Sequence, residues 1–298
     1  MQSDKEAVGI HRNQLGVHAL VWVGGWSEAE CRDAITRSAE CGYDLIEIPV
    51  LNPANINIET TRRALEEAGM ASACSLGLGV DTDVSSDDAA AVARGEQLLG
   101  NALAVARDIG ATYLGGILYG ALHKYSSPLS AKGRENAVSA VRRLAVKAAA
   151  SDMRLGLEVV NRYESNLLNT AEQAMAFLDE VGESNVFVHL DTYHMNIEEI
   201  DFAEPVRRCG SRLGYVHVGE SHRGYLGQGT VNFDDFFAAL AEVGYDGTIT
   251  FESFSSAVVD PVLSNTLAIW RDPWTNSKDL ALQARKFVRD RLSQPVSG

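Results

Sequence analysis

Four residues of types that bind divalent metals stand at or near the ends of four successive β-like runs in the second half of the chain. They are Glu158, Asp191, His217 and Glu252, and apolar residues occupy the alternate positions of each run. Successive side chains of a strand point to opposite faces, so the apolar positions can pack against covering helices. The alternation of apolar and polar positions therefore predicts that these four side chains lie on the face of the sheet opposite the apolar residues.

This combination of one imidazole and three carboxylates predicts a metal site. Three carboxylates held close together cannot all stay ionised unless their pKa values rise or a divalent cation neutralises them. The set suits Mn²⁺, with Co²⁺ or Mg²⁺ as alternatives, and suits Zn²⁺ less well. We expect one divalent metal ion per subunit. The competing interpretation is four separate polar residues, each hydrogen-bonded to a neighbouring loop.

Further polar residues follow the same runs. Glu164, His194 and Arg223 offer an acceptor, a donor that can change protonation state, and a fixed cation. Such groups can hold hydroxyls and an oxygen on which negative charge develops, so we expect them to bind substrate. Each could instead stabilise its own loop.

Residues in the first half of the chain could complete a pocket. His18, Trp22 and Cys74 fall near the ends of the first and third β-like runs and could form its wall, although core packing would also explain them. His189 and Glu47 also face inward, but we expect them to be core residues rather than ligands.

These residues need a frame of alternating strands and helices. Eight β-like runs are expected at 15–22, 43–50, 71–78, 112–119, 154–161, 186–191, 213–219 and 247–252. Helical periodicity is expected over 28–40, 58–67, 89–108, 135–150, 171–181, 233–242 and 278–292, with a short helix near 198–209. No linker or composition break divides them. The pattern predicts a single (β/α)₈ TIM barrel over residues 1–298, with 1–13 a flexible N-terminal extension and 255–298 a C-terminal extension.

Local signals mark several of these boundaries. Ser27 with Glu30, and Thr170 with Gln173, have the form of capping boxes. Glycines stand where helix ends need a left-handed residue, at Gly42, Gly69, Gly110 and Gly244. A doubly wound open sheet is the competing architecture. It would normally carry a glycine-rich phosphate loop after its first strand, and no such spacing is present, so we expect no nucleotide cofactor.

The amino-acid composition limits the kinds of partner that the protein can bind. The formal net charge of −14 disfavours nucleic acid. No run approaches the roughly 18 apolar residues of a membrane span, and the polar start lacks a signal-peptide core, so we expect a cytoplasmic protein with no membrane partner. The four cysteines are scattered along the sequence, so we expect reduced thiols rather than a set of disulfides. An apolar segment at 255–274 predicts a lid or a subunit interface.

Four motifs carry a resemblance to a known family. They are Leu157–Glu164, His189–Glu199, His217–Gly224 and Phe251–Phe254. With them the sequence resembles the ketose 3-epimerases, the group that acts on D-tagatose, D-allulose (D-psicose) or L-ribulose within the xylose-isomerase-like barrels. The resemblance covers nearly the whole chain.

The resemblance implies roles for these residues. Glu158, Asp191, His217 and Glu252 would bind Mn²⁺ or Co²⁺, and Glu158 and Glu252 would also form the acid/base pair. Glu164, His194 and Arg223 would contact O1, O2 and O3 of a small-molecule ketose. The resemblance further implies a homodimer or homotetramer. The segment 18–22 departs from the aromatic-rich version of the D-tagatose enzymes, which leaves the preferred sugar open.

The implied reaction agrees with the two carboxylates. Inverting C3 of a ketose requires proton removal from one face and proton return to the other, so two groups must flank the carbon. An aldose–ketose isomerase of the hydroxypyruvate or rhamnose type is the nearest alternative. A DNA-cleaving metal nuclease of the same superfamily is opposed by the acidic charge, and a non-catalytic sugar-binding protein would not need both glutamates.

Overall fold

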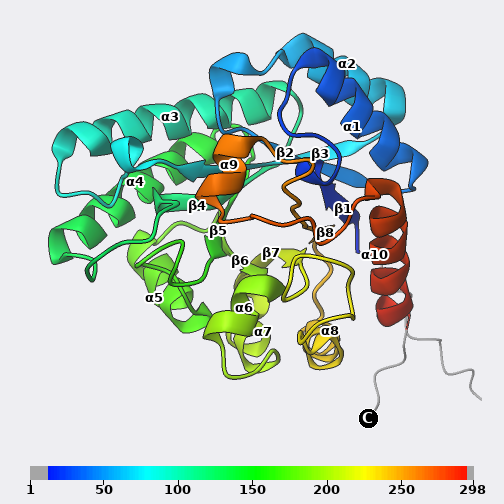
Figure 1. Cartoon of the computed structure of the whole chain (residues 1–298). Coiled ribbons are helices and arrows are strands. Elements are labelled where there is room, and N and C mark those ends of the chain that lie inside the picture. The colour runs from blue at the N-terminus through cyan, green and yellow to red at the C-terminus, as the bar shows by residue number, and fades with distance from the viewer. Residues whose placement is uncertain (1–12, 294–298) are drawn as a thin grey trace, which may run out of the picture.

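Eight parallel strands close into a barrel in the computed structural model, which describes residues 13–293. Each strand pairs with the next, and β8 pairs with β1 (Figure 1). The strands are β1 (Leu15–His18), β2 (Leu45–Pro49), β3 (Ala71–Leu78), β4 (Tyr113–Ala121), β5 (Arg154–Val159), β6 (Val186–Asp191), β7 (Leu213–Val218) and β8 (Ile249–Phe251). The (β/α)₈ barrel predicted from the sequence is confirmed.

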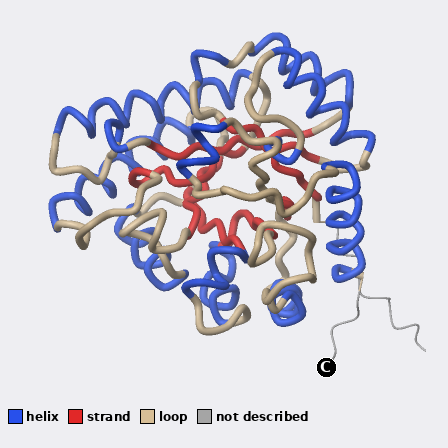
Figure 2. Tube along the Cα trace, viewed as in Figure 1, coloured by secondary structure: helices blue, strands red, loops and turns tan. Residues whose placement is uncertain are grey.

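Helices surround the barrel (Figure 2). They are α1 (Glu28–Glu40), α2 (Ile58–Ala68), α3 (Ala89–Asp108), α4 (Ala131–Ala149), α5 (Ala171–Val181), α6 (Thr192–Glu198), α7 (Glu204–Cys209), α8 (Phe233–Glu242), α9 (Pro261–Thr266) and α10 (Ser277–Leu292). In Figure 1 the short α9 lies across the end of the barrel, whereas α10 stands on its outside. Because α10 contacts α8 and β8, it completes the outer ring, and within the described part of the expected C-terminal extension the segment 255–276 lies outside the regular repeat.

The helix signals in the sequence are present as structure. Both capping boxes form, at Ser27 with Glu30 and at Thr170 with Gln173. The four helix-ending glycines have positive φ, namely Gly42, Gly69, Gly110 and Gly244. The bounds of α1, α3, α5 and α8 are those expected from periodicity.

Several elements differ from expectation, most of them by one or two residues at an end. The strand expected over 15–22 ends at His18, because the side chain of His18 accepts a hydrogen bond from Leu20 N (3.3 Å) and starts a 3₁₀ turn over Ala19–Val21. α4 begins four residues early, where Ser130 caps Gly133 N. The short helices α6 and α9 have no counterpart among the expected helices, and the helix expected near 198–209 is the shorter α7.

The N-terminal extension lies mostly outside the described residues, which begin at Asn13. That residue is buried, and its Nδ2 donates to the carbonyls of Tyr245 (3.1 Å) and Gly247 (2.8 Å). The described chain is therefore anchored to the barrel from its first residue.

The barrel interior is packed in layers. Toward the amino ends of the strands, Leu45, Ala73, Tyr113 and Tyr215 form a buried cluster in which the two tyrosine rings stack at 4.4 Å. Gly156 makes room for it, since a Cβ there would lie 1.5 Å from the Tyr113 hydroxyl. Because this cluster fills the amino end of the barrel, a site for polar side chains can form only at the carboxyl ends of the strands. Among the described residues no helix has the length and apolar character to cross a membrane.

Candidate active site

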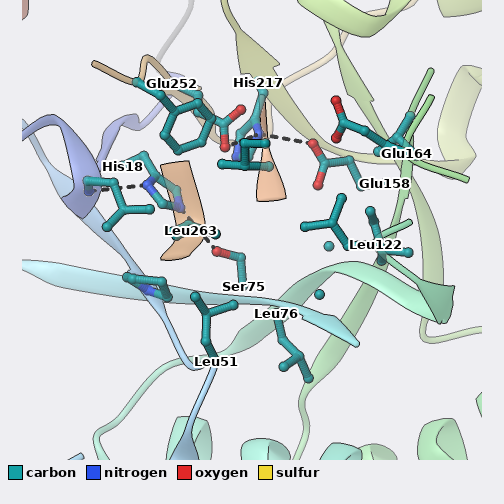
Figure 3. Close-up of a pocket in the computed structure, with 18 of the residues that line it drawn as sticks. His18, Leu51, Ser75, Leu76, Leu122, Glu158, Glu164, His217, Glu252 and Leu263 are labelled. Carbon is teal, nitrogen blue, oxygen red and sulfur yellow. Dashed lines mark hydrogen bonds and ion pairs between the residues drawn. The ribbon is translucent and has the colours of Figure 1, made fainter. Parts of the chain in front are cut away.

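The four predicted metal ligands meet at the carboxyl end of the barrel. Glu158, Asp191 and His217 lie at or next to the ends of β5, β6 and β7, and Glu252 directly follows β8. Each offers one ligand atom, and these atoms all lie within 4.8 Å of one another. All four residues are buried except for Glu158, which is slightly exposed to the pocket drawn in Figure 3.

The imidazole of His217 is oriented toward this group. Its Nε2 lies 2.7 Å from Oε2 of Glu47. Its Nδ1 lies 3.5 Å from Oε1 of Glu158 and 3.4 Å from Oε1 of Glu252, and although it is buried it has no hydrogen-bond partner among the described residues. A buried nitrogen without a partner beside three carboxylates is a donor set that fits a divalent metal ion.

The electrostatics of the group also favour a cation. Burial raises the pKa of Glu158, and burial raises that of Asp191 to about 6 against the opposing effect of Arg223. The guanidinium Nη1 of Arg223 lies 2.8 Å from Oε2 of Glu252 and 3.2 Å from Oδ2 of Asp191. One guanidinium faces three carboxylates, so a divalent ion would relieve the remaining repulsion.

Arg223 is itself held in a strained position. Its φ is +58°, a left-handed conformation that non-glycine residues seldom adopt. The guanidinium lies over the ring of Tyr193 at 3.7 Å, and the Arg223 carbonyl accepts a hydrogen bond from Ser253 Oγ (2.5 Å). These contacts fix the cation at the pocket.

His194 presents a neutral donor to the same space. Its Nδ1 accepts from the backbone N of Asn161 (3.2 Å) and lies 2.8 Å from Asn161 Nδ2, so the proton belongs on Nε2. That Nε2 lies 3.6 Å from Oδ2 of Asp191 and 3.8 Å from Oε1 of Glu158. Burial, together with nearby Arg223, holds the pKa of His194 well below its usual range.

Glu164 completes the polar rim. Its Oε1 accepts from Asn161 Nδ2 (2.8 Å), and burial raises its pKa to about 7. Glu164, His194 and Arg223 all line the pocket that Glu158, His217 and Glu252 also line. The structure thus brings the three predicted substrate-binding residues together with the four candidate metal ligands. These four, called the metal group below, are Glu158, Asp191, His217 and Glu252.

The three residues predicted to form the pocket wall do not all line the pocket. His18 lines the pocket, with its Nε2 3.3 Å from Ser75 Oγ. Trp22 does not, because it is buried in the core with the guanidinium of Arg37 over its ring at 4.7 Å. Cys74 does not either, since it points outward from β3 into the core, and its neighbour Ser75 faces the pocket instead.

Apolar side chains form the rest of the pocket. They come from loops near β2, from β4 and the segment after it, and from the crossing α9 segment, and they include Leu51, Ile117, Leu122, Leu263 and Leu267. Figure 3 shows Leu51 and Leu263 on the His18 side and Leu122 on the side of Glu158. The segment 255–274, expected to be a lid or an interface, thus contributes to the pocket wall.

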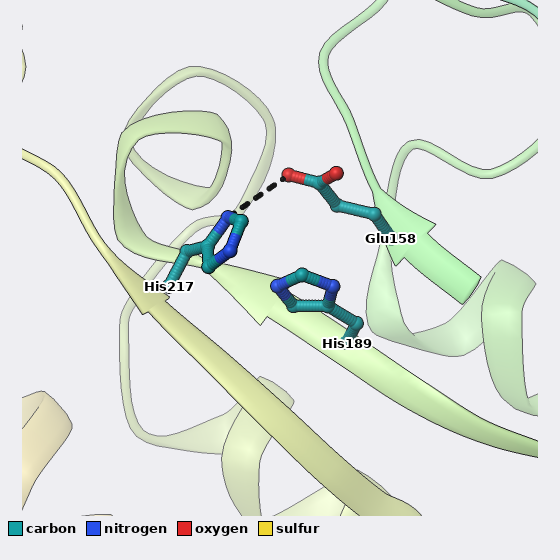
Figure 4. A group of neighbouring side chains, drawn as sticks. All are labelled: Glu158, His189 and His217. Carbon is teal, nitrogen blue, oxygen red and sulfur yellow. Dashed lines mark ion pairs between the residues drawn. The ribbon is translucent and has the colours of Figure 1, made fainter. Parts of the chain in front are cut away.

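Two inward residues that we expected to be core lie beside the metal group. His189 is fully buried, and within residues 13–293 neither of its ring nitrogens has a hydrogen-bond partner. Its ring packs edge-on against His217 at 4.1 Å (Figure 4). Glu47 is buried as well, but it contacts His217 directly. Sequence reasoning missed that contact because β2 and β7 become neighbours across the interior only when the sheet closes. The signal available was an inward-phased glutamate in an apolar strand.

Comparisons with known proteins agree with this geometry. The family described as Xylose isomerase-like TIM barrel matches residues 35–290. The chain is 52% identical over 280 residues to the L-ribulose 3-epimerase of Methylomonas sp. (strain DH-1), covering 94% of this chain and 98% of that protein. It is 48% identical over 280 residues to the ketose 3-epimerase of Arthrobacter globiformis, covering 94% and 97%.

A solved structure extends the likeness to three dimensions. The D-allulose 3-epimerase from Methylomonas sp. in complex with D-allulose superposes with a TM-score of 0.93 at 52% sequence identity, covering 94% of this chain and 98% of that chain. The chain is an enzyme of the isomerase class, and it belongs to the ketose 3-epimerases of the xylose isomerase-like TIM barrel family.

Proposed function

We propose that this enzyme epimerises free ketoses at C3, interconverting pairs such as D-fructose and D-allulose, D-tagatose and D-sorbose, or L-ribulose and L-xylulose. The single observation that carries the proposal is the pair Glu158 and Glu252, two pocket carboxylates that approach the same nitrogen of His217 at 3.5 Å and 3.4 Å. Relatives named L-ribulose 3-epimerase and D-allulose 3-epimerase support the substrate class.

The two glutamates would carry the proton steps. One removes the proton from C3 to give a cis-enediolate, and the other returns a proton to the opposite face. In the reverse reaction the roles exchange. Burial raises the pKa of Glu158, so this carboxyl holds a proton more readily than an ordinary glutamate does.

Glu158, Asp191, His217 and Glu252 would hold one divalent metal ion, Mn²⁺ in our proposal, with Co²⁺ or Mg²⁺ as alternatives. When bound, the ion would polarise the C2 carbonyl and stabilise the negative charge that develops there. The support is the close spacing of the four donors and the unpartnered Nδ1 of His217.

The rim residues would orient the sugar. The Nε2–H of His194 and the guanidinium of Arg223 would donate to substrate oxygens that gain negative charge during proton removal. Glu164, with its pKa near 7, can accept from a hydroxyl or donate to it. His18 would contact the far end of the ketose, where the other lining residues are largely apolar and exclude water.

An aldose–ketose isomerase is not favoured. It would move hydrogen between C1 and C2, and it does not need a carboxylate on each face of one carbon. The named relatives are 3-epimerases.

Product analysis tests the proposal. The protein is stripped with a chelator, reloaded with Mn²⁺, and incubated with D-fructose, D-tagatose or L-ribulose, and the products are separated by chromatography. We expect C3 epimers that form only with metal. Glu158→Gln and Glu252→Gln should form C3 epimers about 10²–10⁴-fold more slowly, whereas the exposed Glu172→Gln should match wild type. Aldoses without C3 epimers would contradict the proposal.

We further propose a cytoplasmic homodimer or homotetramer. All four cysteines are free and buried, which suits a reducing compartment. Trp270 and Val262, on the segment that crosses the mouth, are 76% and 75% exposed and would be covered by a second subunit. A monomer mass by light scattering at working concentration would contradict the assembly.

A further inference from the structure

We propose that Glu47 is a positioning residue that holds His217 in the one tautomer able to bind a metal ion through Nδ1. The inference rests on the metal site proposed above. Both side chains are 1% exposed, and Oε2 of Glu47 lies 2.7 Å from Nε2 of His217. The contact is therefore a short hydrogen bond shielded from water.

The chemistry of the contact decides where the proton lies. A neutral imidazole carries its proton on one nitrogen and leaves a lone pair on the other, and an ionised carboxylate can only accept. The hydrogen bond to Glu47 thus puts the proton on Nε2. When the ring is neutral, as metal binding requires, the lone pair is therefore on Nδ1, the nitrogen that faces Glu158 and Glu252. A metal ion needs that lone pair.

Packing alone would not make this choice. The ring of His189 lies edge-on to His217, with 4.1 Å between ring centroids and an interplanar angle of 85°, which limits how far His217 can tilt (Figure 4). His189 makes no hydrogen bond that would distinguish the nitrogens of His217. The carboxylate of Glu47 supplies that distinction.

The second oxygen of Glu47 makes no competing hydrogen bond. Oε1 has no hydrogen-bond partner in the part of the chain that the structure describes, and it lies 3.8 Å from Nε2 of His18. His18 accepts from Leu20 N at Nδ1, so its Nε2 carries the proton, and that group lies closer to Ser75 Oγ, at 3.3 Å. Glu47 is therefore committed to His217 rather than shared between the two histidines.

Glu47→Gln tests the inference, because it keeps the shape and replaces a carboxylate that can only accept with an amide that can also donate. The amide can donate N–H to Nε2 of His217, which would move the imidazole proton to Nδ1 and block the metal. We expect Mn²⁺ to bind about 10–100-fold more weakly in equilibrium titrations without substrate. The visible spectrum of the Co²⁺ form should also change, and excess Mn²⁺ should restore part of the turnover.

A matched control removes a different hydrogen bond from the same barrel interior. Thr250→Val deletes the contact between the Thr250 and Tyr215 hydroxyls (2.6 Å) and no hydrogen bond of His217. It should leave the Mn²⁺ affinity and the Co²⁺ spectrum of wild type in place. Glu47→Asp keeps an acceptor but shortens its reach, so its affinity should fall between those of wild type and Glu47→Gln.

The outcomes separate the two proposals. A folded Glu47→Gln protein with wild-type Mn²⁺ affinity and Co²⁺ spectrum overturns the role of Glu47 and leaves the metal site standing. If Glu47→Gln does not fold, Glu47→Asp decides, and unchanged affinity there overturns the role as well. A wild-type protein that epimerises ketoses but binds no divalent ion overturns the metal site and the role of Glu47 together.

Discussion

The carboxylate of Glu47 on β2 and the imidazole of His217 on β7 meet inside the barrel, 2.7 Å apart and 170 positions apart in the chain. The two strands are not neighbours in the sheet, because β2 pairs with β1 and β3 while β7 pairs with β6 and β8. Only closure of the barrel brings the side chains together. The orientation of His217 thus depends on the whole sheet rather than on one loop.

Metal removal should destabilise the protein. Four buried donors with one neighbouring guanidinium keep unrelieved repulsion in the metal-free state. Adding Mn²⁺ at about 100 times its Kd should raise the free energy of unfolding by about 2.7 kcal/mol, since the ion binds only the folded chain. Thermal unfolding with chelator and with Mn²⁺ measures this. His217→Asn should lose most of the gain, and an equal gain there would count against the site.

Ionisation of the buried Glu164 should lower the free energy of unfolding at alkaline pH. Its pKa is about 7 in the folded protein, because burial raises it above the ordinary value of 4.5. The folded state therefore binds more protons than the unfolded state between these values, so its contribution to stability falls as pH rises from 4.5 through 7 and stays low above. Glu164→Gln does not titrate and removes this loss.

Urea unfolding at pH 5 and pH 8.5 checks the sign for Glu164. We expect the variant to gain about 1–3 kcal/mol relative to wild type at pH 8.5, and less at pH 5. Both proteins should be compared in the same metal state. An equal difference at the two pH values would show that the carboxyl titrates normally.

The cysteines should be unreactive in the native enzyme. Burial raises the pKa of all four thiols, that of Cys209 to about 12, so few thiolates exist at pH 8. Iodoacetamide should label none of them until denaturant is added, as counted by mass spectrometry. Rapid native labelling of Cys74, blocked by a ketose, would instead return Cys74 to the pocket.

Much of the active end could be predicted because apolar alternation is strong in the second half of the chain. Val186–Asp191 matches β6 at both ends, and Val216 with Val218 fixes His217 as inward. Parallel strands in a barrel bring their carboxyl ends to one place, so the alternation alone predicted that the four candidate ligands would lie together.

The misplaced residues lie where that alternation is weak. β3 consists mostly of small residues, from Ala71 through Cys74 and Ser75 to Gly77, so the sequence does not show which residues face inward. Cys74 was therefore predicted to line the pocket, whereas Ser75 does so in the structure. β1 seemed longer than it is because the apolar run continues to Trp22 while the backbone turns at His18. The Glu47 contact needed the closed sheet.

Hydrogen exchange at C3 tests most directly the claim that two carboxylates serve opposite faces. In D₂O with saturating Mn²⁺, wild type should place deuterium at C3 of both epimers. Glu158→Gln and Glu252→Gln should lose epimerisation by about 10²–10⁴-fold, while each exchanges the C3 hydrogen of one epimer and the two variants choose opposite epimers. Deuterium at C1 instead of C3, or epimerisation at the wild-type rate in either variant, would contradict the account.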